Sequence, residues 1–324
     1  MNVILTLNIF YRLMKEVGIR TPKACKELIT DLETQLARRN FSLDRNTRKR
    51  IHMYSTWSNA VTYSFSLLRG YTPTSQEQHD SLCLGALTPV ADDLMDATGE
   101  ALSWDDSVRE PENAQEMLFE ILKNKLKPLR MEQPRFEIYA RKVERAQANS
   151  MRQLETELSD TNIVERITYD KGGFTANLYR MVLRNEPLAG EEEMIYTLGA
   201  YFQVLDDLYD MYDDQAEGIR TLVTKNSDIR EVRNRMRSLE RQFGSRLMHL
   251  HYREKDKLKA YAALMIIVTR GRIAQDYYLK KQGNERKLDL NAFKREELII
   301  DMDSWPMILR NFWETWLALE RKNY

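Results

Sequence analysis

Apolar residues recur at intervals of three and four along most of this 324-residue chain, and that spacing constrains the fold more than any other feature. It is the period of an α-helix with one buried face. The chain also contains only 12 Gly and 8 Pro, so few residues interrupt the pattern. The sequence therefore predicts an all-α protein.

Interruptions of the pattern mark the connections between helices. We expect helices over residues 2–17, 23–39, 44–69, 74–98, 112–126, 134–158, 161–185, 190–214, 226–250, 254–282, 290–299 and 305–322. None of the gaps is a linker rich in Pro, Gly or Ser, and no internal repeat appears. One domain over residues 1–324 is the simplest arrangement. Gly172 and Gly173 fall inside a predicted helix, where paired glycines indicate a break or a close backbone approach.

Charge and cysteine content argue against several classes of function. Basic and acidic residues number 49 each, so the formal charge is zero and nothing favours a nucleic-acid or membrane-surface partner. Cys25 and Cys83 are too few for a disulfide framework, and their helical positions predict small buried residues. The apolar stretch 3–11 is too short to span a bilayer and lacks a basic leader, so we expect an amphipathic helix docked on the core. A cytoplasmic protein fits these features.

Two acidic clusters follow strongly apolar stretches. Residues 92–96 read Asp-Asp-Leu-Met-Asp after the apolar run 82–91, and residues 206–210 read Asp-Asp-Leu-Tyr-Asp after the run 194–205. Carboxylates beside buried surface must be neutralised, and divalent metal is the usual means. One such string in a chain with 49 acidic residues is weak evidence, but the second predicts two halves of one metal site.

Helical spacing indicates which carboxylates act together. Asp206, Asp210 and Asp214 lie at i, i+4 and i+8, so they share one face, and Asp207 is displaced by roughly 100° as an orienting or alternate ligand. Mg²⁺ takes oxygen ligands and is commonly completed by water and substrate phosphate oxygens, so a diphosphate is the expected third partner. The predicted metal ligands are Asp92, Asp93, Asp96, Asp206, Asp207, Asp210 and Asp214.

These motifs resemble those of the class I isoprenoid synthase superfamily, which includes terpene cyclases, trans-prenyltransferases, and squalene and phytoene synthases. Residues 92–96 match the aspartate-rich first motif, and residues 202–210 match the Phe-Gln-x-x-Asp-Asp-x-x-Asp second motif of prenyltransferases. The row of Asp206, Asp210 and Asp214 also has the spacing of the cyclase triad, in an all-acid version. The resemblance implies a single-domain helical barrel with the motifs on facing helices, and three Mg²⁺ ions bound with diphosphate.

Departures from the family pattern favour one reaction. Elongating prenyltransferases carry an Arg-Arg pair after the first motif, whereas residues 97–103 here read Ala-Thr-Gly-Glu-Ala-Leu-Ser. The Asp-x-x-Glu-Asp motif of squalene-type synthases is not matched either. The leading hypothesis is a class I terpene synthase, a lyase that ionises an allylic prenyl diphosphate and cyclises or rearranges the carbocation. Alternatives are a prenyltransferase, by elongation or squalene/phytoene-type condensation, and a noncatalytic helical scaffold.

Several residues outside the metal set are candidates for substrate chemistry. Asp92 and Asp206 promote ionisation as metal ligands, and the rings of Phe174 and Phe202 are expected to stabilise the carbocation. The anion-binding candidates are Lys171, Arg180 and Arg220, with Arg270 and Arg272 less favoured. Gly218 is a plausible helix end, after which Arg220 would reach an anion only when its loop closes.

The sequence leaves several properties undetermined. Substrate chain length and product skeleton depend on which bulky side chains meet across helices, and the choice between cyclase and condensing enzyme stays open. A homodimer is compatible with the sequence. The aromatic helix expected over residues 305–322 has either a capping or an interface role.

Overall fold

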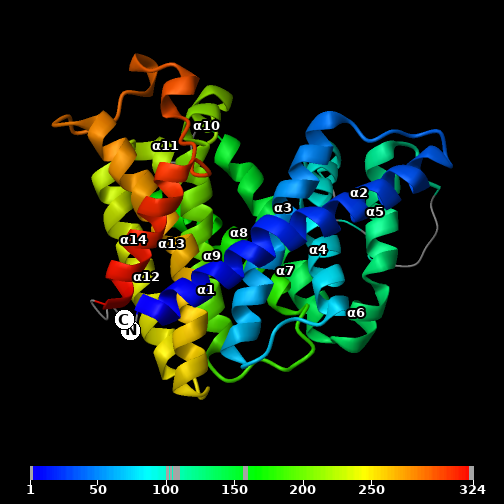
Figure 1. Cartoon of the computed structure of the whole chain (residues 1–324). Coiled ribbons are helices and arrows are strands. Elements are labelled where there is room, and N and C mark those ends of the chain that lie inside the picture. Colours follow the sequence, from blue (N-terminus) through cyan, green and yellow to red (C-terminus); the bar gives the residue numbers. More distant parts are fainter. Residues whose placement is uncertain (1–2, 100–101, 103, 105–109, 156–159, 321–324) are drawn as a thin grey trace. The chain divides into compact units, whose positions relative to one another are not determined.

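The computed structural model of the protein describes residues 3–99, 102, 104, 110–155 and 160–320. Within these residues every regular element is a helix, so the all-α prediction is confirmed. Contacts group the chain into two compact units (Figure 1). The first unit comprises residues 1–10, 149–177 and 187–324, and the second comprises residues 11–148 and 178–186. That residues 1–324 form a single domain stays a prediction.

The first unit is built around α9 (Glu191–Tyr209), which packs on α12 (Ile229–His249) and α13 (Glu254–Gln282). Its other elements are the start of α1 (Val3–Lys15), the 3₁₀ turn η2 (Met151–Leu154), α8 (Thr161–Arg180) as far as Asn177, α10 (Met211–Glu217), α11 (Leu222–Asn226), the 3₁₀ turns η3 (Leu290–Ala292) and η4 (Arg295–Leu298), and α14 (Trp305–Glu320). The Tyr201 hydroxyl donates to the Val268 carbonyl at 2.8 Å and joins α9 to α13. Gly271 leaves room for that ring, because a Cβ there would lie 2.3 Å from the Tyr201 oxygen.

Two helices of the first unit cross at glycines. A Cβ on Gly172 of α8 would lie 2.2 Å from the carbonyl oxygen of Gly199 on α9, and one on Gly173 would lie 2.3 Å from the Tyr196 ring. Only glycine permits backbones to approach this closely. The structure therefore confirms the close approach predicted from the glycine pair, and α8 continues through it without a break.

The second unit is organised by α3 (Arg45–Leu68) and α4 (Ser75–Thr98), which pack along one another. Its other elements are a π-helical turn η1 (Glu16–Arg20), α2 (Thr21–Ala37), α5 (Ala114–Lys125), α6 (Lys127–Glu132) and α7 (Arg135–Ser150) as far as Ala148. Asp44 caps α3 through its carboxylate, and Thr74 forms a capping box with Glu77 at the start of α4. Cys25 and Cys83 are buried, as predicted.

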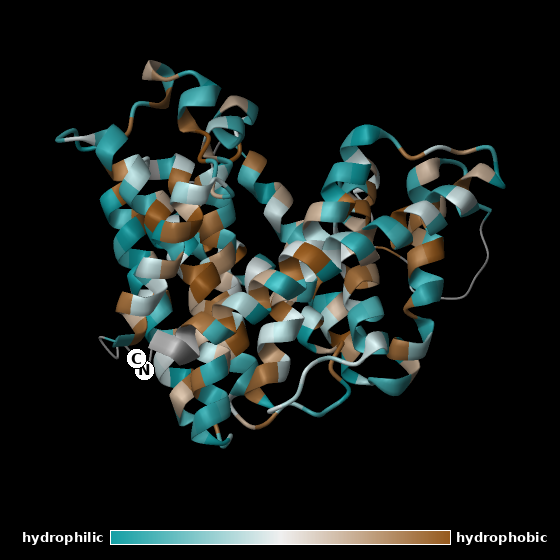
Figure 2. Cartoon of the chain, in the orientation of Figure 1, coloured by the Kyte–Doolittle hydropathy of each residue, from teal (hydrophilic) through white to brown (hydrophobic). Residues whose placement is uncertain are grey.

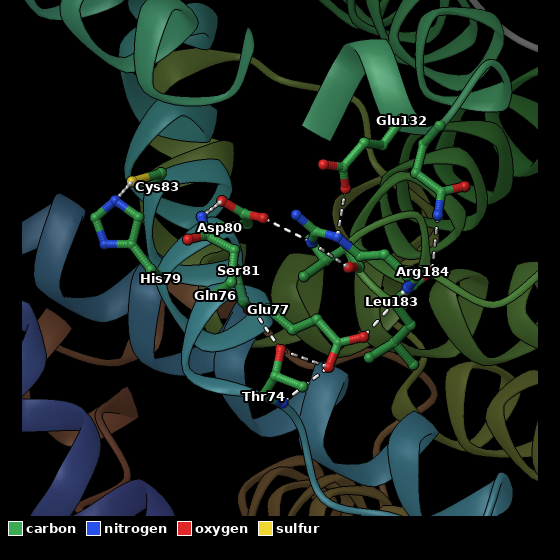
Figure 3. Close-up of polar contacts among 12 residues, drawn as sticks. Thr74, Gln76, Glu77, His79, Asp80, Ser81, Cys83, Glu132, Leu183 and Arg184 are labelled. Atoms are coloured by element: carbon green, nitrogen blue, oxygen red, sulfur yellow. Dashed lines mark hydrogen bonds and ion pairs between the residues drawn. The ribbon is translucent and has the colours of Figure 1, made fainter. Parts of the chain in front are cut away.

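A buried network of charges joins α4 to residues 178–186 (Figure 3). Glu77 and Asp80 are only 3% and 1% exposed. Arg184 donates its amide to Glu77 Oε1 at 3.2 Å, its Nη1 pairs with Asp80 Oδ2 at 2.7 Å, and its Nε donates to Glu132 Oε2 at 3.0 Å. Buried carboxylates require such partners, because an unpaired buried charge is strongly destabilising. This network holds the start of the helix that carries the first acidic cluster.

The N-terminal helix is amphipathic, as predicted. Ile9 and Leu13 of α1 are buried, and Asn8, Arg12 and Lys15 are exposed. The Phe10 ring meets Phe312 of α14 edge-on, with centroids 5.3 Å apart. Among the described residues, no helix combines the length and hydrophobicity needed to cross a bilayer. Figure 2 shows hydrophobic stretches where α9 and α13 meet their neighbours in the first unit.

Most predicted helices occur with boundaries shifted by a few residues, but the structure departs from the prediction at five places. The short helices α6 and α11 were missed, because Pro128 in the first turn and the Thr221 capping box start helices too short to show a period. The predicted helix 190–214 divides at Asp210, and the predicted helix 161–185 ends at Arg180. Residues 290–299 form two 3₁₀ turns. The predicted helices 134–158 and 305–322 extend partly outside the described residues.

Candidate metal centre

The second acidic cluster lies where α9 passes into α10. Asp210 separates the two helices with φ −92° and ψ 2°. Its amide donates to the Asp206 carbonyl at 2.9 Å, and the Asp214 amide donates to the Asp210 carbonyl at 2.8 Å. Helical hydrogen bonding therefore continues across the junction, and the three aspartates remain one turn apart. Asp206 and Asp210 are exposed, Asp214 is half-buried, and Asp207 is buried.

Neutral donors hold the buried member of this cluster. Gln203 Nε2 donates to Asp207 Oδ1 at 3.1 Å and to Asp206 Oδ2 at 3.3 Å. Thr168 Oγ1 on α8 donates to Asp207 Oδ2 at 3.3 Å. Both oxygens of Asp207 are thus oriented by neutral protein groups, which donate hydrogen bonds but contribute no positive charge.

The pKa values of the cluster are shifted upward. Burial, followed by the charges of neighbouring carboxylates, raises the pKa of Asp207 to about 7, of Asp210 to about 6 and of Asp214 to about 8. The pKa of Asp206 is also raised by loss of hydration, although the side chains of Asp206 and Asp210 still reach solvent and this moderates the effect at both positions. Lys171 on α8 opposes the shift at all four positions.

This donor set fits a hard divalent cation. It offers only carboxylate oxygens, and a bound cation would favour their charged forms, which burial and neighbouring carboxylates disfavour. Within the described part of the chain, no three His, Cys, Asp or Glu side chains already converge as a metal-binding group. The cluster therefore fits Mg²⁺ as an open site, in which water or substrate oxygens complete the coordination.

The first acidic cluster lies at the C-terminal end of α4 and is held by three other helices. Arg50 on α3 forms an ion pair with Asp93 Oδ1, and Gln115 Nε2 on α5 donates to Asp93 Oδ2 at 3.2 Å. Gln147 Nε2 on α7 donates to Asp96 Oδ1 at 3.1 Å. These partners could not be predicted from the sequence, because no local pattern links them to residues 92–96.

The two clusters belong to different compact units, Asp92, Asp93 and Asp96 to the second and the other four aspartates to the first. Their union in one metal site stays a prediction. Each cluster by itself gathers carboxylates at the end of a largely buried helix, as the sequence indicated.

A second cation beside the 206–214 cluster was also missed. Arg295 of η4 binds Asp213 through two parallel bonds, Nε to Oδ1 at 2.8 Å and Nη2 to Oδ2 at 2.7 Å. It lowers the pKa of Asp213 and acts in the same direction on Asp210. The pair ties α10 to the segment after α13.

The structure is similar to a solved geranyltranstransferase from Thermotoga maritima, with a TM-score of 0.50 over 80% of this chain and 99% of that chain. The chain has the isoprenoid synthase fold. At 12% identity the likeness establishes the fold alone. No family model and no curated protein matches the sequence. The fold class predicted from the two acidic motifs is thus confirmed.

One predicted substrate-binding residue has a structural role in this isoprenoid synthase fold. Arg180 is fully buried at the end of α8, where Nη1 donates to the Leu183 carbonyl at 3.1 Å and Nη2 donates to the Asn185 carbonyl at 2.6 Å. It satisfies carbonyls of the segment that follows the helix. That Arg180 binds the substrate anion stays a prediction.

The other predicted cations differ in their surroundings. Lys171 is half-buried and acts electrostatically on the 206–214 cluster. Arg220 lies between α10 and α11, after Gly218 ends α10 with φ 76°, and its backbone is bound to Gln153. Loop closure over Arg220 stays a prediction. Of the less favoured pair, Arg270 binds Asp303 and Arg272 binds the buried Glu240.

Phe174 and Phe202, the two predicted aromatic residues, are half-buried in the first unit of the chain. The Phe174 ring meets Tyr196 edge-on with centroids 5.4 Å apart, and the Phe202 ring meets Tyr201 at 6.3 Å. Tyr196 is fixed in turn, because its hydroxyl donates to Asp170 at 2.6 Å. Their role toward a carbocation stays a prediction.

Proposed function

We propose that this protein is a Mg²⁺-dependent enzyme that acts on an allylic prenyl diphosphate, and that its reaction is the ionisation and cyclisation or rearrangement of a class I terpene synthase. The observation that supports this most directly is the 206–214 cluster. Four aspartates with raised pKa values lie beside Lys171 in a chain with the isoprenoid synthase fold. Such a cluster favours the binding of cations together with an anionic ligand.

The proposed metal ligands come from both acidic clusters. Asp206, Asp210 and Asp214 would hold Mg²⁺ from the α9–α10 junction, and Asp207 orients Asp206 through the shared donor Gln203. Residues 92–96 supply the second set, and together the clusters accommodate three ions with the diphosphate. When bound, Mg²⁺ stabilises the negative charge that develops on the departing diphosphate.

The chain's own side chains complete the reaction. Lys171 contributes a positive charge for the diphosphate oxygens. Breaking the allylic C–O bond leaves its electron pair on the diphosphate and a carbocation on the hydrocarbon. The faces of Phe174 and Phe202 stabilise that cation, by up to about 2 kcal/mol each when desolvated. A cyclised hydrocarbon follows when a proton is lost before water adds.

A prenyltransferase is the second candidate. Residues 202–210 match the prenyltransferase form of the second motif, and the similar solved structure is a geranyltranstransferase. The same aspartates and Lys171 would support the same ionisation. The two candidates differ in what captures the carbocation, namely an internal double bond or a second prenyl substrate.

Product analysis separates the candidates. Purified protein is incubated with geranyl, farnesyl or geranylgeranyl diphosphate and Mg²⁺, each with and without isopentenyl diphosphate. Hydrocarbon from a single allylic substrate supports the terpene synthase, and a longer diphosphate supports the prenyltransferase. If no substrate is consumed, and if Mg²⁺ with inorganic diphosphate does not raise the melting temperature, the noncatalytic scaffold is favoured.

Matched variants test the site assignment. Asp206→Asn should abolish turnover while the far-ultraviolet circular dichroism stays unchanged. Asp213→Asn is the control, because Asp213 lies on the same junction but is ion-paired with Arg295. Full activity in Asp206→Asn would refute its assignment as a ligand.

A further inference from the structure

Arg50 occupies a carboxylate that the proposed function assigns to metal binding. Its guanidinium contacts Asp93 Oδ1, and Gln115 uses the other oxygen of the same carboxylate. The side chains of Arg50 and Asp93 are 28% and 29% exposed, so solvent only partly screens the pair. Asp93 therefore has a protein cation of its own.

The electrostatic reach of Arg50 extends beyond this one contact. Its charge also interacts favourably with Asp92, the first residue of the cluster. Arginine stays protonated throughout the range in which proteins are stable, so Arg50 is a permanent counter-ion that cannot be removed by deprotonation. A metal ion that binds Asp93 must therefore compete with the guanidinium for the same carboxylate.

The 206–214 cluster provides the contrast. There the hydrogen bonds to Asp207 come from the neutral donors Gln203 and Thr168. A cation that binds Asp207 competes with neutral donors for its oxygens, whereas a cation that binds Asp93 competes with a guanidinium. The two clusters should therefore differ in metal affinity when no substrate is present.

We propose that Arg50 is an internal counter-ion of the first cluster, which competes with Mg²⁺ for Asp93 and restricts metal binding there until a diphosphate is present. The inference rests on the proposed function, because it assumes that residues 92–96 bind metal. Diphosphate favours the exchange in two ways. It supplies oxygen ligands to the incoming ion, and it offers the displaced guanidinium a new anionic partner.

Direct metal binding tests this competition without an assay of turnover. Free Mn²⁺, a paramagnetic substitute for Mg²⁺, is measured by electron paramagnetic resonance in titrations of the full chain with and without inorganic diphosphate. In Arg50→Gln, Mn²⁺ should bind roughly five- to tenfold more tightly than in wild type when diphosphate is absent, as expected when a partly buried ion pair no longer competes. The difference should shrink when diphosphate is added.

The stability of the variant provides a second readout. In EDTA, Arg50→Gln should melt at a lower temperature than wild type, because Asp93 loses its counter-ion, and Mn²⁺ should restore more of that loss than it adds to wild type. Arg50→Lys keeps the charge but offers a less extended set of donors, and should show intermediate affinity. If Arg50→Gln does not fold, the Mn²⁺ affinity of Arg50→Lys tests the competition instead.

The control variant is Arg48→Gln. Arg48 lies on the same helix and forms an ion pair with Glu33, away from the acidic cluster. Its Mn²⁺ affinity should equal that of wild type. Unchanged or weaker Mn²⁺ binding in both Arg50 variants would overturn the competition. Failure of wild type to bind Mn²⁺ even with diphosphate would instead refute the proposed metal-dependent function.

Discussion

Gly172 of α8 and Gly199 of α9 meet with no room for a side chain between them. A Cβ on either residue would lie within 2.3 Å of the other's carbonyl oxygen. Lys171 directly precedes the first glycine, and Gln203 lies one turn after the second. The crossing thereby brings a cation and an orienting amide to the 206–214 cluster.

Replacing Gly172 by Ala should destabilise the protein by about 3 kcal/mol, because neither backbone can retreat without disturbing the packed helices. The measurement is urea unfolding followed by circular dichroism. Gly18→Ala is the matched control, since a Cβ there meets nothing within 4 Å, and it should change the stability by less than about 1 kcal/mol. Equal effects of the two substitutions would show that the crossing is not tight.

Stability without metal should fall as the pH rises from about 4 to about 8. The folded pKa values of Asp207 and Asp214 are about 7 and about 8, above the ordinary value of 3.8. Between those limits the folded chain holds protons that the unfolded chain releases, so the free energy of unfolding decreases with pH. Melting temperatures in EDTA at pH 5, 6, 7 and 8 measure this trend.

The same pKa shifts predict how Mg²⁺ acts on that profile. A cation binds the deprotonated cluster, so its stabilising effect should be larger at pH 8 than at pH 5. Asp207→Asn should flatten the metal-free profile, whereas Asp213→Asn should preserve it. An unchanged slope in Asp207→Asn would contradict the assignment of the titration to this cluster.

Lys171 and Arg180 should respond differently to loss of charge. Arg180→Met removes the buried guanidinium from the Leu183 and Asn185 carbonyls, of which Leu183 keeps a bond from Gln133, and should cost about 3 kcal/mol of stability. Lys171→Met should change stability by less than about 1 kcal/mol but weaken binding of inorganic diphosphate in the presence of Mg²⁺ by about tenfold. Calorimetry of binding and urea unfolding measure the two effects. Strong destabilisation by Lys171→Met would show that Lys171, like Arg180, has a structural role.

Local features of the sequence were sufficient for most of the helices and for one helix crossing. The 3.6-residue period is set by side chains within one helix, and the glycine pair 172–173 reports a steric requirement at its own position. The spacing of Asp206, Asp210 and Asp214 also survived the junction at Asp210, because backbone hydrogen bonds continue through it.

Partners from distant helices could not be predicted in the same way. Arg50, Gln115 and Gln147 approach residues 92–96 from three other helices, and Arg295 reaches Asp213 from beyond α13. Such contacts depend on packing, which one sequence does not encode in any local pattern. The position of Arg180 at a helix end fits both anion binding and the capping of carbonyls, and its carbonyl contacts could be seen only in the packed structure.

Trp104 should be a stabilising anchor for the connection between α4 and α5. Its ring meets the Phe119 ring edge-on at a centroid distance of 5.8 Å and the Phe136 ring edge-on at 5.7 Å. The Arg130 guanidinium lies 5.2 Å from the centre of the Trp104 ring. Its Nε1 donates to Glu144 of α7, one turn before the residue that binds Asp96. Trp104→Ala should therefore cost about 3 kcal/mol.

Trp305→Ala provides the comparison for that prediction, because Trp305 is 77% exposed and its loss should change stability by less than about 0.5 kcal/mol. Urea unfolding measures both variants. Trp104→Phe should recover part of the stability, since it restores the ring contacts but not the hydrogen bond to Glu144. Because α7 holds both Glu144 and Gln147, loss of Trp104 should also weaken Mn²⁺ binding at residues 92–96 in the presence of diphosphate. Equal stability of Trp104→Ala and Trp305→Ala would show that the anchor contributes nothing.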